Sequence, residues 1–306
     1  MSRFDYDSLT ILAAVIREGS FEAAAKSMKV TQSAVSQRIK QLEEKVGVVL
    51  VARGRPCVPT EAGLQFFRHV EQVGLLQQEL AERMRALVGG EEGIAATVRI
   101  GVNNDSLATW FPKLIKLATK ELGILFDILP DDQEHTESSL RSGDALAVIT
   151  TMETPVQGCK IISLGSMEYV AVASPELYQA HFADGVSLEA LRTCISVAFN
   201  RKDTIQDQWM TTCFGATVPL SIHYVPSYEG YLSCCLNGAG WGLVPSIAGN
   251  PYIKRGELVE LSPGKKVSIA LHWQAAMQSS EILRRLGNMV LEVAREHLVP
   301  DRFRPN

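Results

Sequence analysis

Residues 20–63 read SFEAAAKSMKVTQSAVSQRIKQLEEKVGVVLVARGRPCVPTEAG, and this stretch decides the fold of the N-terminal region. Ser20 is placed to cap a helix that runs through three alanines, and Thr31 is placed to cap a second helix after a short turn. Apolar side chains recur at helical spacing along the second helix, at Val35, Ile39, Leu42 and Val46. The pattern predicts two helices that cross closely, because the alanines offer small side chains at the contact.

The opposite face of the second helix carries glutamine, serine, lysine and arginine side chains. Glutamine can pair with adenine, serine suits either partner, and lysine or arginine meets phosphate or guanine, so this face suits the major groove of DNA. Two helices joined by a tight turn and presenting such a face are typical of a helix-turn-helix. The open alternative is a helical hairpin with a solvated polar face. The candidate DNA-binding residues here are Thr31, Gln32, Ser33, Ser36, Gln37, Arg38 and Lys40.

A second basic feature follows this helix. Two short extended pieces, at 48–51 and 58–59, flank a turn rich in glycine and proline, which predicts a β-hairpin wing. Arg53 and Arg55 lie in that turn, where they can reach the DNA backbone or the minor groove. They complete the set of candidate DNA-binding residues.

A long helix is predicted to begin after Thr60 and to end before Gly89-Gly90, which read as a hinge. Side chains along it repeat at alternating four- and three-residue steps, the pattern of a coiled-coil seam. A seam requires a partner helix, most simply the same helix of a second subunit, whereas the alternative is an amphipathic helix lying on its own domain. The predicted dimerisation residues are Phe66, Val70, Val73, Gln77, Leu80, Met84 and Leu87.

The remainder of the chain alternates predicted strands and helices. A strand at Val98–Val102 leads into the polar segment Asn103–Ser106, which opens a helix. In open α/β sheets, a polar loop at the carboxyl end of a strand is a place where ligands bind. Further alternation as far as residue 297 predicts a largely parallel sheet covered by helices, so the fold class is α/β.

The formal charge of −4 divides unevenly along the chain. Residues 1–90 carry a net charge of +2, whereas residues 91–306 carry −6. The stretch from 26 to 68 reaches +5, and contact with phosphates needs a local basic face of this kind. The overall negative charge therefore does not exclude double-stranded DNA as a partner.

Composition excludes several other classes of protein. With 46% hydrophobic and 21% charged residues over 306 positions, the chain has the composition of a globular protein of about two domains. No apolar run approaches the roughly 18 residues of a membrane span, and the first residues show no signal peptide, so we expect a cytoplasmic protein without a membrane partner. The six cysteines lack the spacing of a disulfide framework and are expected to be reduced thiols.

The sequence motifs give little support for an enzyme. Gly238–Gly242 precedes a strand instead of following one, which is the wrong order for a dinucleotide loop. Ser262 and Lys265 have Ser-x-x-Lys spacing, but the Pro-Gly pair between them favours a turn. No His/Cys pair has zinc spacing and no Gly-x-Ser-x-Gly elbow occurs, so we expect no catalytic residue, metal or cofactor. The competing class is an α/β enzyme with an appended DNA-binding domain.

Residues 21–63 resemble the LysR-type transcriptional regulators, and the resemblance continues through nearly the whole chain. Its carriers are Phe21–Ala25, Thr31–Ser36, Ile39, Leu42-Glu43, Gly47, Leu50, Arg53 and Thr60–Gly63. The resemblance implies a winged helix-turn-helix with a long dimerisation helix, joined to an effector-binding domain of two subdomains that is similar to periplasmic solute-binding proteins. It also implies a homodimer or homotetramer that binds promoter DNA, contacts RNA polymerase and responds to a small-molecule effector.

The same resemblance implies the domain boundaries. In chain order these are a DNA-binding domain at 1–60, a linker helix and hinge at 61–93, and an effector-binding domain at 94–306, whose subdomain I takes about 94–165 and 267–306 and whose subdomain II takes about 166–266. The chain would cross between the subdomains near Gly165-Ser166 and return near Pro263-Gly264.

A narrower resemblance, carried by Gly101–Trp110, Arg38–Glu43 and Leu271–Trp273, is to the LysR members that sense lysine or arginine and control basic-amino-acid export and related genes. Such an effector has one carboxylate, which could lie at the helix N-terminus at Ser106, and two cations that protein carboxylates could neutralise. The candidate effector-binding residues are Asn103, Asn104, Asp105, Ser106, Asp131, Asp132, Thr150, Thr151, Ser227 and Glu229. The open alternatives are a helix cap at Asp105, an exposed loop at 131–132, and a different effector.

Overall fold

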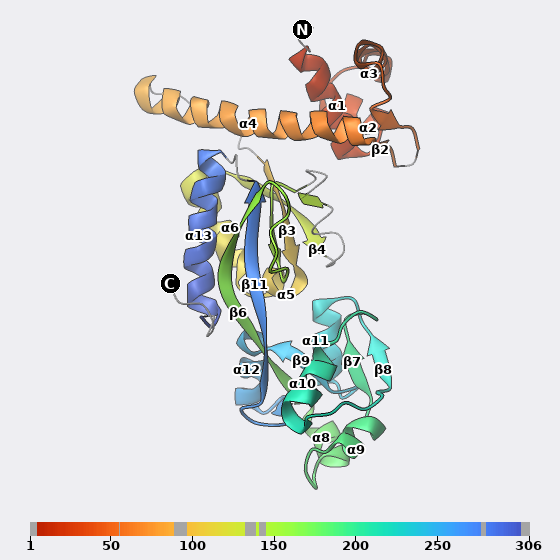
Figure 1. Ribbon diagram of the computed structural model, residues 1–306, viewed down its shortest axis with the longest axis vertical. Coiled ribbons are helices and arrows are strands. Elements are labelled where there is room, and N and C mark those ends of the chain that lie inside the picture. The colour runs from red at the N-terminus through yellow and green to blue at the C-terminus, as the bar shows by residue number, and fades with distance from the viewer. Residues whose placement is uncertain are drawn as a thin grey trace.

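The computed structural model of the chain is elongated, with a helical domain at one end and two α/β lobes below it (Figure 1). The structure describes residues 5–54, 56–88, 97–131, 139–140, 145–276 and 280–300. Within those ranges, no helix is long and apolar enough to cross a lipid bilayer.

Three short helices begin the N-terminal domain, namely α1 (Tyr6–Glu18), α2 (Phe21–Ser27) and α3 (Gln32–Val46). Ser20 and Thr31 cap α2 and α3 through their hydroxyl groups, as predicted. The apolar faces of these helices form a small core that also takes side chains from α4. The predicted helix-turn-helix is therefore confirmed.

The wing and the long helix follow directly. Strands β1 (Val51–Ala52) and β2 (Val58–Pro59) pair in antiparallel orientation, and α4 (Glu61–Val88) begins one residue later. A Cβ atom added at Gly63 would lie 2.0 Å from the Leu50 carbonyl oxygen, so the first turn of α4 packs directly on the chain that enters the wing.

The upper lobe contains most of a seven-stranded sheet of order β10-β6-β11-β5-β3-β4, with β9 also paired to β6. Its elements are β3 (Thr97–Asn103), α5 (Asn104–Ala108), α6 (Phe111–Leu122), β4 (Leu125–Asp131), β5 (Ala147–Thr150), β6 (Cys159–Ala173), β11 (Lys266–Ala276) and α13 (Glu281–His297). Strand β3 pairs in parallel with β4 and β5, and its apolar side chains enter a core that α6 and α13 cover.

The lower lobe is smaller and carries shorter elements. They are α8 (Pro175–His181), α9 (Leu188–Thr193), β7 (Ser196–Ala198), α10 (Ile205–Phe214), β8 (Ile222–Tyr224), α11 (Tyr228–Leu236), β9 (Gly242–Pro245), α12 (Ser246–Arg255) and β10 (Val259–Glu260). Three of these, α9, β10 and α12, have weak signals in the sequence. The first two are very short, and Pro251 lies inside α12, where proline argues against a helix.

The sheet is mixed, which differs from the largely parallel sheet that the sequence predicted. Strands β6 and β11 are the longest pair and run antiparallel to each other, and β11 is also antiparallel to β5. Both long strands pass from one lobe to the other (Figure 1). Alternation of strands and helices predicts the parallel units correctly, but it holds no information about strands that serve as connections between lobes.

Two irregularities lie opposite each other along these strands. Gly165 on β6 has φ +103°, and its pairing partner Leu271 on β11 adjoins a register shift before His272. The crossing expected near Gly165-Ser166 stays a prediction. The return differs from the expected Pro263-Gly264, because that turn reverses the chain beside the end of β6 in the lower lobe, and β11 must then run back along β6 before it reaches the upper lobe.

Candidate functional site

The outer face of α3 carries the polar side chains that the sequence singled out. Thr31, Gln32, Ser33, Gln37, Arg38 and Lys40 are exposed and Ser36 is half-buried, while Val35, Ile39 and Leu42 on the inner face are buried. Two of the cations have acidic neighbours: Arg38 lies 3.4 Å from Asp5, and Lys40 lies 3.7 Å from Glu44. Both pairs are solvent-exposed, so water and salt weaken them and the cations remain able to meet phosphate.

The wing adds a third cation beside this face. Arg53 is exposed, and its guanidinium carbon lies 5.2 Å from the centre of the Phe21 ring at the start of α2. This contact holds the wing against the helix-turn-helix. Arg55, the other predicted wing residue, lies outside the described residues.

The predicted seam on α4 divides into two parts. Phe66 and Val70 pack in the core of the chain's own N-terminal domain, and Val73 is half-buried. Further along, Gln77 is exposed and Leu80 is 60% exposed. The side chains of Met84 and Leu87 lie outside the described residues. The first turns of α4 therefore pack against the N-terminal domain of the same chain, and the exposed Leu80 lies further along the helix.

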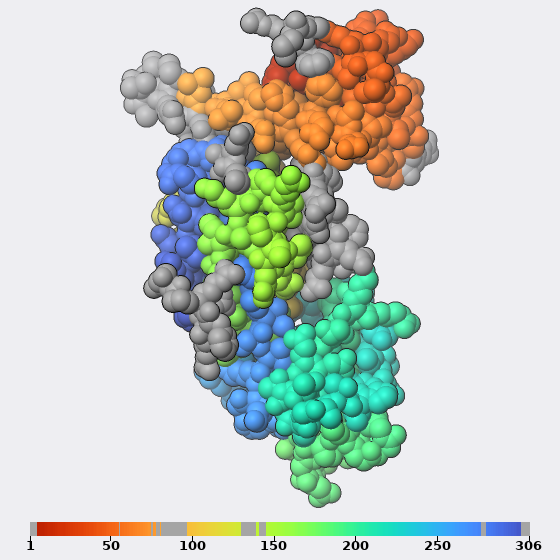
Figure 2. Space-filling model, in the orientation of Figure 1, coloured from red at the N-terminus to blue at the C-terminus, as the bar shows by residue number. Residues whose placement is uncertain are grey.

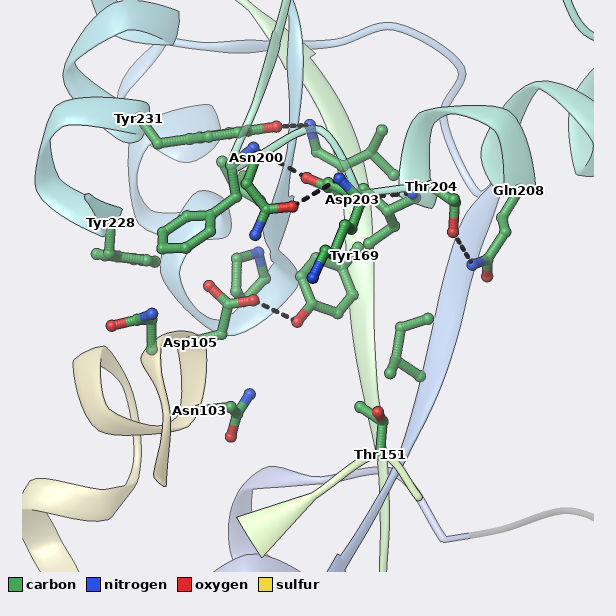
Figure 3. Close-up of a pocket in the computed structure, with 18 residues that line it drawn as sticks. Asn103, Asp105, Thr151, Tyr169, Asn200, Asp203, Thr204, Gln208, Tyr228 and Tyr231 are labelled. Carbon is green, nitrogen blue, oxygen red and sulfur yellow. Dashed lines mark hydrogen bonds between the residues drawn. The ribbon is translucent and has the colours of Figure 1, made fainter. Parts of the chain in front are cut away.

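A cavity of about 210 Å³ lies between the two lobes, and we call it the interlobe pocket. The wall from the upper lobe, which we call the upper wall, comes from the end of β3 and the start of α5. The wall from the lower lobe, which we call the lower wall, comes from α11 and the loop between β7 and α10, and Figure 3 draws it above the other. The lining residues are Asn103, Asn104, Asp105, Thr151, Tyr169, Phe199, Asn200, Lys202, Asp203, Thr204, Ile205, Gln208, Tyr228, Tyr231, Leu243, Val244, Pro245 and Ile269.

Asp105 is the most perturbed acid of the pocket. The Tyr169 hydroxyl donates a hydrogen bond of 2.5 Å to its Oδ2 (Figure 3). Burial raises the pKa of Asp105 above its ordinary range, the hydrogen bond from Tyr169 opposes this shift, and the negative charge of Asp203 adds to it. Burial and the neighbouring Asp105 in turn raise the pKa of Tyr169 well above its usual value. A cation entering the pocket would favour the charged form of Asp105.

Asp203 holds the loop that forms the lower wall. Its Oδ2 accepts a hydrogen bond of 3.0 Å from the Phe199 amide, and its Oδ1 accepts one of 3.1 Å from the Ile205 amide. Among the lining residues, Asp105 and Asp203 are acids and Lys202 is a base, so acidic groups outnumber basic ones. The pocket therefore has the charge balance that suits a ligand with more positive than negative groups.

A buried acceptor in the upper wall points to a ligand that donates hydrogen bonds. The side-chain oxygen of Asn103 is buried and has no hydrogen-bond partner among the residues that the structure describes. Buried polar atoms are nearly always paired, because an unpaired one loses its bond to water without a replacement. An ammonium or guanidinium group in the pocket would supply the missing donor.

Comparison with known proteins decides the family. Residues 6–64 match the bacterial regulatory helix-turn-helix proteins of the lysR family, and residues 91–295 match the LysR substrate binding domain. The chain belongs to the LysR family. It is a DNA-binding transcriptional regulator with an effector-binding domain, as the sequence motifs predicted.

Individual relatives match over almost their full length. The HTH-type transcriptional regulator ArgP of Pseudomonas fluorescens is 36% identical, and the match covers 97% of this chain and 99% of ArgP. The lysine export transcriptional regulatory protein LysG of Corynebacterium efficiens is 36% identical, with 95% and 98% covered. The structure of full-length LysG of Corynebacterium glutamicum with the bound effector Arg has a TM-score of 0.69 at 34% identity, covering 97% of this chain and 100% of LysG. These relatives are named as regulators and not as enzymes.

Within this LysR-family chain, the interlobe pocket brings together four of the predicted effector-binding residues, Asn103, Asn104, Asp105 and Thr151. Asp105 lies inside α5 and bonds to Tyr169, so its side chain faces the pocket and does not act as the N-cap of that helix.

The other predicted residues lie elsewhere. Ser106 is fully buried, and Thr150 is buried with its hydroxyl bonded to the Met152 amide. Ser227 caps α11, and Glu229 is exposed outside the lining. Asp131 ends β4 with a side chain outside the described residues, and Asp132 is outside them entirely.

Sequence reasoning missed the lower wall of the pocket. Asn200, Lys202 and Asp203 follow β7, which pairs in parallel with β8, so they occupy the same kind of position as Asn103–Asp105 after β3. The rule that ligands bind at the carboxyl ends of parallel strands therefore applied twice, once in each lobe. A strand over 194–199 is readable in the sequence, so the same rule could have pointed to the polar residues that follow it.

Proposed function

We propose that arginine or lysine is the effector of this regulator and that it controls promoters of basic-amino-acid export or related genes. The observation that carries the proposal is the placement of two carboxylates, Asp105 and Asp203, on opposite lobes around one small cavity. LysG, whose structure holds arginine, and the lysine export regulator support the same class of ligand. A cavity of about 210 Å³ suits a molecule of amino-acid size better than a drug-sized ligand, which occupies about 300 Å³ or more.

The chemistry of a basic amino acid matches the pocket group by group. Its two cations can pair with Asp105 and Asp203, and Asn103 can accept a hydrogen bond from one of them. Its carboxylate can pair with Lys202, the basic side chain of the lining, with hydrogen bonds from Thr151 and Asn200. Helix α5 has only five residues, so we assign the carboxylate to Lys202 in preference to the predicted helix N-terminus at Ser106.

The tyrosines add a second source of selectivity. Tyr228 and Tyr231 from α11 and Tyr169 from β6 line the pocket with Phe199. Aromatic rings attract ammonium and guanidinium groups, and the attraction grows when the cation is desolvated. Burial raises the pKa of Tyr228 to about 12, so this ring stays neutral and cannot act as a third anion at physiological pH.

For DNA, we propose that α3 enters the major groove and that the wing contacts the backbone beside it. Gln32, Ser33, Ser36 and Gln37 would read base edges, while the cations of α3 and the wing would meet phosphate. The residues that contact the DNA backbone would be Thr31, Arg38, Lys40, Arg53 and Arg55. The exposed face of α3 supports this assignment.

The assembly and its setting are also proposals. The later part of α4 would pair with the same helix of a second subunit, and two such dimers would form a tetramer that contacts RNA polymerase in the cytoplasm. We retain residues 1–60 as the DNA-binding domain, 61–93 as the linker and 94–306 as the effector-binding domain. Exposed Leu76 and Leu80, at 54% and 60%, support the pairing of α4.

Isothermal titration calorimetry with L-arginine and L-lysine tests the effector. We expect the wild-type protein to bind at least one of them and the Asp203→Asn variant to bind it more weakly, since one effector cation would lose its partner. Asp184→Asn, an exposed acid of the lower lobe, is the matched control and should bind as the wild type does. Absence of heat with both amino acids would rule out the basic-amino-acid effector.

A further inference from the structure

Strand β3 connects the two functional parts of the molecule. Its carboxyl end, Asn103, lines the interlobe pocket, and Asp105 follows two residues later. Near its other end, Arg99 lies over the ring of Phe67 on α4, the helix that leads out of the DNA-binding domain. Figure 1 shows α4 next to the upper lobe that contains β3. One short strand therefore touches both the pocket and the linker helix.

The contact between β3 and α4 is an arginine placed over an aromatic ring. The guanidinium carbon of Arg99 lies 5.8 Å from the centre of the Phe67 ring. Phe67 is only 1% exposed and belongs to the same core as α1 and α3. The effector-binding domain thus places a cation on a side chain that closes the core of the DNA-binding domain.

The guanidinium of Arg99 is held in position from its own domain. Its Nε and Nη2 atoms lie 2.7 Å and 2.6 Å from Oδ2 of Asp127, which is its direct pairing partner on β4. The Arg99 side chain is 18% exposed and the Asp127 side chain is 39% exposed, so this ion pair is shielded from water mainly on the arginine side. A shielded pair of this kind restricts the guanidinium more than a solvated one does.

Movement at the pocket end of β3 would reach Arg99 through the sheet. Strand β3 pairs with β4 at every residue from Thr97 to Asn103, and it pairs with β5 on its other side. A strand held on both sides moves as a unit, because a packed interior resists compression. Helix α13 also contacts α4, and the space-filling view shows α4 resting on the upper lobe (Figure 2).

We propose that Arg99 is a positioning residue that couples the interlobe pocket to the DNA-binding domain through Phe67. The proposal rests on effector control of DNA binding as set out above. In the coupled molecule, effector and DNA each change the affinity of the other by the same factor. Arg99 contributes to that factor while it touches neither ligand.

The test compares the DNA affinity of each variant with and without saturating L-arginine or L-lysine, on a duplex that the wild-type protein selects from a random library. For the wild type we expect the two affinities to differ by about 5- to 150-fold. Arg99→Ala should bind the amino acid alone and the DNA alone nearly as the wild type does, but its ratio of DNA affinities with and without effector should be close to one. Arg99→Lys keeps the charge but loses the planar group that spans Asp127 and Phe67, so its ratio should also fall.

Two further variants separate coupling from stability. Phe67→Leu keeps an apolar side chain in the core and removes the ring, and it should lower the ratio without further loss when combined with Arg99→Ala. Arg192→Ala removes an exposed ion pair with Glu189 on α9 and should leave the ratio unchanged. A merely structural role for Arg99 predicts a lower melting temperature together with a wild-type ratio, and that result would overturn the proposal.

A measurement without effector tests the role of Arg99 independently of which ligand the pocket binds. If the wild type binds neither amino acid, the proposed effector is wrong, and hydrogen exchange tests whether Arg99 of the effector-binding domain stabilises α4, the contact on which the coupling depends. Arg99→Ala should then lose amide protection in α4 at residues 61–74, whereas Arg192→Ala should not. Unchanged protection of that segment in the Arg99 variant would overturn the proposal.

Discussion

Burial gives the charge of Asp105 an energetic cost in the folded protein. Its folded-state pKa is raised above the ordinary value of 3.8, chiefly by burial. A raised pKa in an acid means that the folded protein holds a proton more tightly than the unfolded chain does. Stability therefore falls as the pH rises from 3.8 through the raised pKa, and it stays reduced above it. At neutral pH the unliganded protein is therefore less stable than it would be with a protonated Asp105, and a cationic ligand would offset this loss of stability.

We accordingly expect Asp105→Asn to unfold at the same or a higher urea concentration than the wild type at neutral pH without effector. The advantage should shrink as the pH is lowered toward 3.8, where the wild-type carboxyl is protonated as well. Urea unfolding followed by circular dichroism across this pH range measures it. Asp184→Asn should show no such trend, and a variant less stable than the wild type at neutral pH would contradict the assignment.

Substitutions of single side chains on α3 should have two kinds of effect on DNA binding. Ser33→Ala or Gln37→Ala should relax discrimination between duplexes at a cost of about 1–3 kcal/mol for the preferred one, because base-edge contacts specify sequence. Lys40→Ala should weaken binding to all duplexes and reduce the salt slope by about one, because phosphate contacts release counterions. Fluorescence anisotropy at several salt concentrations measures both. Equal loss of specific and non-specific binding in all three variants would contradict the placement of α3.

Residues of the pocket could be predicted only in part, for a physical reason. Asn103, Asn104 and Asp105 lie at or just after the end of a seven-residue strand with a clear apolar pattern, so the sequence predicted that they lie at the carboxyl end of a strand. Asp203 lies five residues beyond the end of β7, and Tyr169 lies within β6, directly after Glu168. A side chain that reaches a pocket from the middle of a long strand shows no local sequence signal, because only the tertiary fold brings it there.

At the scale of elements, the junction of the wing and α4 depends on close backbone contact. Gly63→Ala should destabilise the protein by about 1–3 kcal/mol or more, because a Cβ atom there would lie 2.0 Å from the Leu50 carbonyl oxygen. Gly74→Ala, in the same helix, meets nothing within 4 Å and should stabilise α4 by about 0.5–1 kcal/mol. Thermal unfolding measures the pair. A Gly63 variant as stable as the Gly74 variant would show that α4 does not pack on the wing in this way.

Elements with strong local signals were predicted well, and connecting elements were not. Helices α2 and α3 have caps, apolar spacing and a turn in the sequence, and the structure confirms them. The direction of β6 and β11 depends instead on how two lobes are joined, and no local pattern records that. Helix α12 forms despite Pro251 because its start packs against β6 and β9, so tertiary contacts outweigh the unfavourable residue.

At the scale of the whole molecule, dimer formation should depend on the later part of α4. Leu80→Glu should shift the protein toward monomers, because burying a leucine contributes about 1.5–3 kcal/mol and a buried carboxylate would oppose pairing. Its 60% exposure in the single chain means that the variant should still fold. Val58→Glu, an equally drastic change at a wing residue that is 54% exposed, should leave the dimer intact. Sedimentation velocity measures both, and a Leu80→Glu dimer as tight as the wild type would exclude pairing through this part of α4.

The charge of the chain differs between its DNA-binding and its effector-binding parts. The basic stretch at 26–68 includes the exposed face of α3 and the wing, while the acids of the effector-binding domain include the two carboxylates of the interlobe pocket. Recognition of a cationic effector by those carboxylates is the central claim.

Calorimetry that compares L-arginine with L-citrulline tests that claim most directly. Citrulline has nearly the same shape as arginine, but a neutral group replaces the guanidinium. We expect arginine to bind at least about 100-fold more tightly, because leaving one partner of a buried charge pair alone costs about 3 kcal/mol or more. Equal affinity for the two ligands would contradict recognition of the cation by Asp105 and Asp203.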